Sequence, residues 1–227
     1  MLKNTVHTGS ISIWAVFFMK KAMYRIMVCW LAALFVWCAF LLADREQLNH
    51  GLIRFHVIAN SDSREDQAIK LKIRDAVLAS MEEDLRKISD IDTARVYLRE
   101  HLPKIQLLVD QTLDGLGYSG GSAVSLCRER FDVRHYDTFS LPAGVYESLK
   151  IVIGDGMGKN WWCVSFPGLC LPATTADFID AAVGSGFSEP LVQTLSRNED
   201  YQIRFYFLNQ LGKLQNILFP ESITPCS

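Results

Sequence analysis

The 227-residue sequence lacks several features that mark specialised classes of protein. Its 7 Pro and 14 Gly are too few for a disordered or fibrous chain. A formal net charge of −2 excludes a strongly basic nucleic-acid binder. There is no CxxC pair and no set of cysteines and histidines at zinc-binding spacing, so we expect no metal site. With 49% hydrophobic residues, the chain can bury a sizeable core.

Acidic residues are absent from the first 43 positions, which hold four basic ones, Lys3, Lys20, Lys21 and Arg25. The following 184 residues carry 19 basic and 25 acidic side chains, a net charge of −6. Between them lies an uncharged run of 18 residues, 26–43, which is just long enough to span a bilayer. The basic flank predicts that the N-terminus stays inside while the acidic body is exported.

The run 26–43 has two interpretations, a signal peptide or an uncleaved membrane anchor. Ala43 is small enough to precede a cleavage site, but Leu41 is a mediocre residue for the −3 position. A buried core helix is disfavoured because the aromatic residues of the run leave no polar face. We also expect translation to begin at Met19, with residues 1–18 reflecting a start placed too far upstream.

The exported body is predicted to be one domain over residues 52–215, joined to the apolar run by a linker, 44–51, and followed by a tail, 216–227. A run of β-branched and aromatic residues predicts a strand over 52–59. Ser63, with Asp66 three residues later, predicts the start of a helix that ends near Met81.

Helical periodicity continues from about residue 92, where Pro103 is expected to end one helix and begin another. Three further strands are expected within residues 120–134, 146–153 and 161–166, and a last helix over 199–214. These elements predict an α+β fold, with a helical first half packed on a mainly antiparallel sheet and an apolar export or anchor helix in front.

Four of the six cysteines lie in the body, namely Cys127, Cys163, Cys170 and Cys226, and they allow three full pairings. Cys163 and Cys170 flank Phe166-Pro167-Gly168, where the chain can reverse. We favour a disulfide between these two in an oxidising compartment, and two buried thiols are the alternative.

Polar residues gather where the strand 52–59 ends, and they suggest two interpretations. In the first, the protein is a hydrolase in which His56 is the base and Asp62 orients it. In the second, His56 is a satisfied core histidine and Asp62 belongs to a helix cap. A nucleophile pair of Cys163 with His56 or His135 is disfavoured, because Cys170 is near enough to oxidise the thiol. No carboxylate pair of the kind that hydrolyses glycans is identifiable.

The segment Asn160-Trp161-Trp162 is the most unusual local feature. Adjacent residues of a strand point to opposite faces, so one tryptophan can fill the core while the other faces solvent, a partner or a covering layer. Exposed aromatic side chains are frequent anchors of binding sites. The preceding Gly154-Asp155-Gly156-Met157-Gly158 fits neither a P-loop nor a dinucleotide motif, so we predict a hairpin loop and no cofactor.

Two stretches resemble the signatures of the stage II sporulation protein R family. The first is His56-Val57-Ile58-Ala59-Asn60-Ser61-Asp62-Ser63, continuing through Lys70 to Arg74-Asp75. The second runs from Leu141-Pro142-Ala143-Gly144 through Asn160-Trp161-Trp162-Cys163 to Leu169-Cys170. The resemblance covers about residues 50–172. Gly168 departs from it, because the family commonly has a second proline there.

The resemblance implies a signalling protein rather than an enzyme. Members are made in the forespore of endospore-forming bacteria and exported into the intermembrane space that faces the mother cell. There they are required to activate a membrane-embedded aspartic protease that removes the pro-sequence of sigma-E. We therefore expect this protease and, through the N-terminal segment, a membrane as partners, and neither nucleic acid nor a small-molecule substrate.

The expected contacts with the protease combine motif placement with side-chain chemistry. They are His56, Asn60, Asp62, Lys70, Arg74, Asp75, Asn160, Trp161 and Trp162. Two other classes remain open from the sequence: an extracytoplasmic hydrolase that uses His56 and Asp62, and a passive structural domain associated with the wall or membrane.

Overall fold

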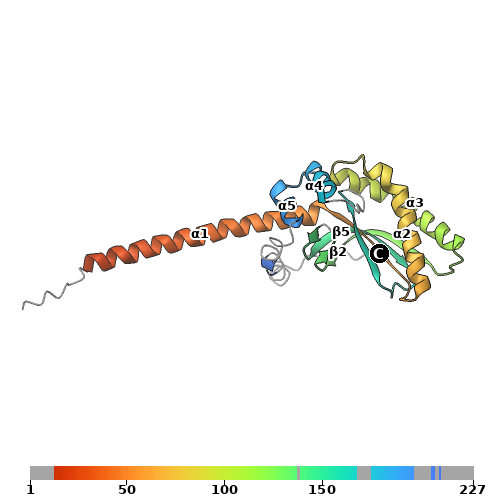
Figure 1. Ribbon diagram of the computed structural model, residues 1–227, viewed down its shortest axis with the longest axis horizontal. Helices are drawn as coiled ribbons and strands as arrows, with labels where there is room; N and C mark the ends of the chain where they lie inside the picture. Colours follow the sequence, from red (N-terminus) through yellow and green to blue (C-terminus); the bar gives the residue numbers. More distant parts are fainter. Residues whose placement is uncertain (1–12, 137–138, 168–174, 197–205, 208–209, 211–227) are drawn as a thin grey trace, which may run out of the picture. The chain divides into compact units, whose positions relative to one another are not determined.

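The computed structural model describes residues 13–136, 139–167, 175–196, 206, 207 and 210. The chain divides into two compact units, residues 1–43 and 44–227. Helix α1 (Ile13–Gly51) is long and apolar enough to cross a membrane, a property that a signal sequence shares (Figure 1). It contains the predicted apolar run 26–43.

The predicted linker 44–51 is helical in the structure, as the last two turns of α1. The reason is local, because this stretch contains no proline and its first glycine is Gly51. Leu48 and Asn49 are buried, so packing also supports these turns.

The predicted α+β fold is confirmed, and its centre is a four-stranded sheet in the order β2-β5-β1-β6. Strand β1 pairs parallel with β5 and antiparallel with β6, and β2 pairs antiparallel with β5, so the sheet is mixed but mainly antiparallel. The strands of this sheet are β1 (Ile53–Ile58), β2 (Ser122–Phe131), β5 (Gly144–Ile153) and β6 (Asn160–Phe166). A second, two-stranded sheet pairs β3 (Arg134–His135) with β4 (Ser140–Leu141).

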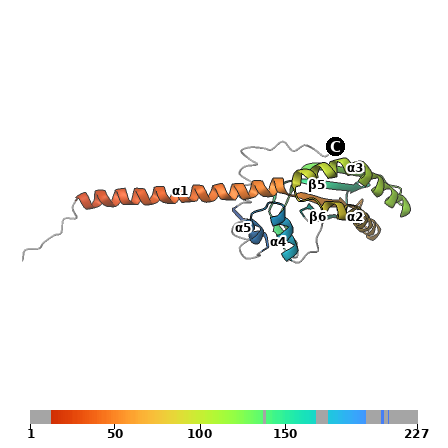
Figure 2. The same cartoon turned by 90° about the horizontal axis from the view of Figure 1, so that it is seen from above.

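Helices α2 (Arg64–Leu85) and α3 (Ile91–Gly115) cover one face of this sheet and form the main core with it (Figures 1 and 2). Alternate residues of β1, namely Ile53, Phe55 and Val57, are fully buried in that core. The period of two then sends Arg54 and His56 to the opposite face. This second face carries the candidate site described below.

The start of α2 follows the predicted cap. Ser63 Oγ accepts a hydrogen bond from Asp66 N at 3.0 Å. The helix continues four residues past Met81 because Leu85 is also buried in the core.

The predicted break at Pro103 is wrong, since α3 runs through it without interruption. Proline removes one backbone hydrogen bond inside a helix. Here Leu98, Ile105 and Val109 remain buried on one stripe on both sides of the proline, and this packing keeps the helix continuous.

Two helices appear where the sequence has no firm periodicity, α4 (Thr175–Gly184) and α5 (Glu189–Ser196). Their buried residues include Ala182, Leu191 and Val192, so tertiary packing rather than a clear stripe defines them. Most of the predicted helix 199–214 and all of the tail 216–227 lie outside the described residues.

Cys127 and Cys163 are both disulfide-bonded, whereas the described Cys29 and Cys38 are free thiols. Cys127 lies on β2 and Cys163 on β6, which are the two edges of the four-stranded sheet. Three strand spacings separate the edges, about 14 Å, whereas a disulfide needs Cα atoms within about 7 Å. These two cysteines are therefore not bonded to each other.

We predict that peptide mapping of the non-reduced protein finds Cys163 linked to Cys170, which lies outside the described residues. Because Cys127 occupies the other sheet edge, a Cys127→Ser variant should keep this linked peptide. A Cys163→Ser variant should instead release one thiol, at Cys170. A peptide that links Cys163 to Cys226 would contradict the prediction.

Candidate functional site

The sheet face opposite α2 and α3 carries a polar cluster centred on His56, which is only 2% exposed. His56 Nε2 lies 2.5 Å from Glu129 Oε1 on β2. The other carboxylate oxygen, Oε2, accepts a hydrogen bond from Lys150 Nζ on β5 at 3.2 Å. One carboxylate thus joins a histidine and a lysine from two other strands.

Aromatic rings enclose His56. Trp162 on the neighbouring strand stacks on the imidazole, with ring centroids 4.6 Å apart and planes 3° from parallel. Phe131 meets both rings edge-on, at 5.8 Å from His56 and 5.2 Å from Trp162. The guanidinium of Arg134 lies 4.6 Å from the Trp162 centroid. Trp162 is therefore part of a covering layer within the domain.

Trp161 points to the opposite face, as the alternation predicts. Its ring meets Phe55 edge-on at 5.7 Å, on the side of the helices. Arg74 of α2 lies over it, with the guanidinium carbon 5.0 Å from the ring centroid, and also pairs with Asp75 at 2.7 Å. The two tryptophans thus pack against separate layers.

Arg54 is fully buried beside this cluster. Its Nη2 donates to the Tyr136 hydroxyl at 2.9 Å, and its guanidinium lies over the rings of Phe131 at 4.1 Å and Tyr146 at 5.3 Å. Among the described residues no group accepts a hydrogen bond from Arg54 Nε or Nη1. Cation–π contacts with these two rings therefore help to stabilise the buried guanidinium charge.

The ionisation of Glu129 reflects its surroundings. Burial opposes the charged form, but the hydrogen bond and the charge of His56, with a further contribution from Lys150, outweigh it and lower the pKa to about 2. The carboxylate is thus ionised at neutral pH.

A second group of polar residues lies at the end of β1 and binds the loop between β5 and β6, residues 154–159. Asn60 Oδ1 accepts from Asp155 N at 3.0 Å, and Asp62 Oδ1 accepts from Lys159 N at 2.7 Å. Lys70 Nζ donates to the Lys159 carbonyl at 2.9 Å, and burial lowers the pKa of this lysine. These side chains tie the loop to the start of α2.

The structure separates the two residues of the hydrolase hypothesis. His56 points into the second face toward Glu129, whereas Asp62 accepts a hydrogen bond from the loop backbone. Asp62 therefore does not orient His56 as the hydrolase hypothesis requires, and His56 pairs with Glu129 instead. The Cys163 nucleophile is also wrong, because that thiol is disulfide-bonded.

The structure places the nine predicted contact residues in separate groups. His56 and Trp162 share the second face, and Asn60, Asp62 and Lys70 hold the β5–β6 loop. The third group, Arg74, Asp75 and Trp161, lies on the helix side, while Asn160 begins β6 opposite Ile58. Whether any of them contacts a partner stays a prediction.

Sequence reasoning missed Arg54 and Glu129. The sequence did contain a signal for Arg54. Arg54 and His56 alternate with the apolar Ile53 and Phe55, a pattern that predicts a strand with a polar second face. Glu129 had none, since 73 residues separate it from His56 and only the sheet register joins them.

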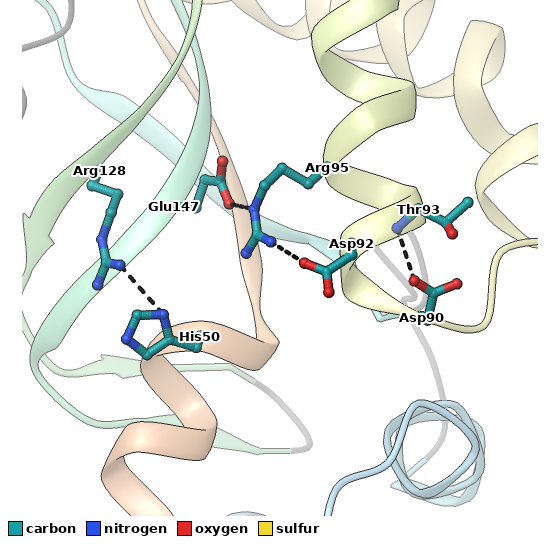
Figure 3. Close-up of polar contacts among 7 residues, drawn as sticks. All are labelled: His50, Asp90, Asp92, Thr93, Arg95, Arg128 and Glu147. Carbon is teal, nitrogen blue, oxygen red and sulfur yellow. Dashed lines mark hydrogen bonds and ion pairs between the residues drawn. The ribbon is translucent and has the colours of Figure 1, made fainter.

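On the helix side, two separate groups of polar contacts join α3 to β5 and β2 to the end of α1 (Figure 3). Arg95 of α3 donates through Nε to Glu147 of β5 at 2.5 Å and also pairs with Asp92. Arg128 of β2 lies 3.3 Å from His50 Nδ1 at the end of α1. These contacts link the helices to the sheet.

Comparison with known proteins places these features in a family. The family model for stage II sporulation protein R matches residues 49–176, which include the four-stranded sheet, α2 and α3. Stage II sporulation protein R of Bacillus subtilis (strain 168) is 34% identical over 151 residues, which is 66% of this chain. The match spans 64% of that relative, slightly less than two-thirds of its length. No solved structure matches the chain.

The His56–Glu129 pair predicts a dependence of stability on pH. The folded pKa of Glu129, about 2, lies below its ordinary value of 4.5, so the stabilisation is complete above pH 4.5 and is lost as the pH falls toward 2. The loss should reach at most about 3 kcal/mol in the free energy of unfolding. Urea unfolding of residues 44–227, followed by tryptophan fluorescence between pH 5.5 and 2.5, measures it.

In Glu129→Gln this part of the pH dependence should disappear, while the exposed control Asp114→Asn should keep it. Identical pH profiles for Glu129→Gln and the unmodified domain would show that the pair contributes nothing.

Proposed function

The chain belongs to the stage II sporulation protein R family, and from this membership we propose that it is an exported signal that activates a protease in a facing membrane. The target is the membrane-embedded aspartic protease of the mother cell that removes the pro-sequence of sigma-E. The chain leaves the forespore and acts in the intermembrane space, so that gene expression in the two cells is coupled.

The observation that carries the proposal is the family match itself, which spans residues 49–176 and thus the sheet domain that follows an apolar helix. The basic residues before the apolar run favour export of that domain, either secreted after cleavage or held by the helix as an anchor. Both routes deliver the same folded surface to the space between the membranes.

The charge of the domain supports a protein partner. Residues 44–227 carry a net charge of −6, which disfavours adsorption to anionic lipids or anionic wall polymers. Specific contacts with a protein surface are then the better source of affinity.

Activation follows from a difference in affinity. A ligand shifts its target only if it binds the active arrangement more tightly than the inactive one. A tenfold preference corresponds to about 1.4 kcal/mol, which one or two well-packed side chains at an interface can supply. The domain therefore needs a shaped surface rather than catalytic groups of its own.

We predict that residues 44–227, added to vesicles that contain the protease, increase cleavage of the sigma-E precursor by about tenfold or more. Two controls accompany this assay. A protease with its catalytic aspartate replaced should give no cleavage, and the domain alone should leave the precursor intact.

The outcomes separate the three classes of function. Cleavage by the domain without the protease would establish a hydrolase and overturn the proposal. Equal protease activity with and without the domain would leave a passive structural role.

A further inference from the structure

The β5–β6 loop, residues 154–159, is fixed to the domain along its whole length. All six of its backbone N–H groups donate hydrogen bonds to acceptors outside the loop. Four of these acceptors come from the end of β1 and the turn after it: Ala59 O, Asn60 O, Asn60 Oδ1 and Asp62 Oδ1. These hydrogen bonds hold the loop against the turn after β1.

Glycine makes this path possible. Gly154 and Gly156 have positive φ angles of 57° and 63°, a region that other residues rarely adopt. At Gly158 a side chain would bring Cβ within 2.3 Å of the carbonyl oxygen of Ser61. The backbone therefore approaches the turn after β1 more closely than any other residue would allow.

Met157 lies on this fixed loop and is 81% exposed, more than any other large apolar residue that the structure describes. Single exposed apolar residues are common on protein surfaces. Met157 differs because a fully hydrogen-bonded loop presents it, between the exposed and oppositely charged Asp155 and Lys159. Such an arrangement suits insertion into an apolar pocket with a polar rim.

We propose that Met157 is the apolar anchor that docks the domain on its protein partner, and that Asn60, Asp62 and Lys70 are positioning residues for the loop. This inference rests on the proposed function, and the partner surface is an apolar pocket on the extracytoplasmic side of the protease. A protein pocket is favoured over lipid because residues 44–227 carry a net charge of −6, which disfavours anionic lipid surfaces.

The test uses the full chain, as the sole copy in sporulating cells, with immunoblots of the sigma-E precursor and of the exported chain. At equal exported amounts, Met157→Ala should slow precursor processing by about tenfold, and Met157→Leu should restore most of it. Leu107→Ala, which truncates another exposed apolar residue on α3, is the matched control and should process normally.

A second pair of variants tests the positioning role. Asp62→Asn keeps an oxygen that can accept from Lys159 N and should retain processing, whereas Asp62→Ala removes it and should lower processing. A contact that depends on the charge of Asp62 would instead fail in both variants.

The results distinguish this inference from the proposed function. Full processing by Met157→Ala, while a chain-free strain processes nothing, would overturn the anchor and leave the function intact. No difference between cells with and without the unmodified chain would overturn the function itself. Weaker binding of Met157→Ala to protein-free anionic phospholipid vesicles, with protease binding unchanged, would identify lipid as the occupant and contradict the inference.

Discussion

The structure depends on the burial of strand β1 from both sides. Its apolar residues face α2 and α3, and its polar residues, Arg54 and His56, face a second layer that must satisfy them without water. The side chains of that layer contact both residues. Glu129 pairs with His56, Trp162 stacks on its ring, and the rings of Phe131 and Tyr146 lie against the Arg54 guanidinium.

The same burial fixes the register of the sheet. A shift of one residue would turn Arg54 and His56 into the apolar core and send Phe55 to the polar side. The Glu129 carboxylate contacts His56 of β1 and Lys150 of β5. The observed register of β1, β5 and β2 brings these three residues together. Burial of the apolar residues and the contacts of Glu129 therefore favour the same register.

The features that the sequence predicted correctly are those that short-range chemistry determines. Ser63 caps α2 because its partner is three residues away, and alternation alone sends Trp161 and Trp162 to opposite faces. Features set by tertiary packing were missed. The stripe of α3 overrides Pro103, and Glu129 meets His56 across 73 residues of chain. The helical conformation of residues 44–51 was not predicted either: local propensity permits it, and burial of Leu48 supports it.

The polar residues after β1 bind another part of the same domain, the β5–β6 loop. Asn60 and Asp62 look exposed and reactive in the sequence, yet their oxygens accept hydrogen bonds from the backbone of the β5–β6 loop. Both residues supply a side-chain oxygen as the acceptor for these N–H groups. The end of β1 thus determines the position of a loop about 95 residues later, and the proposed anchor Met157 depends on this long-range placement.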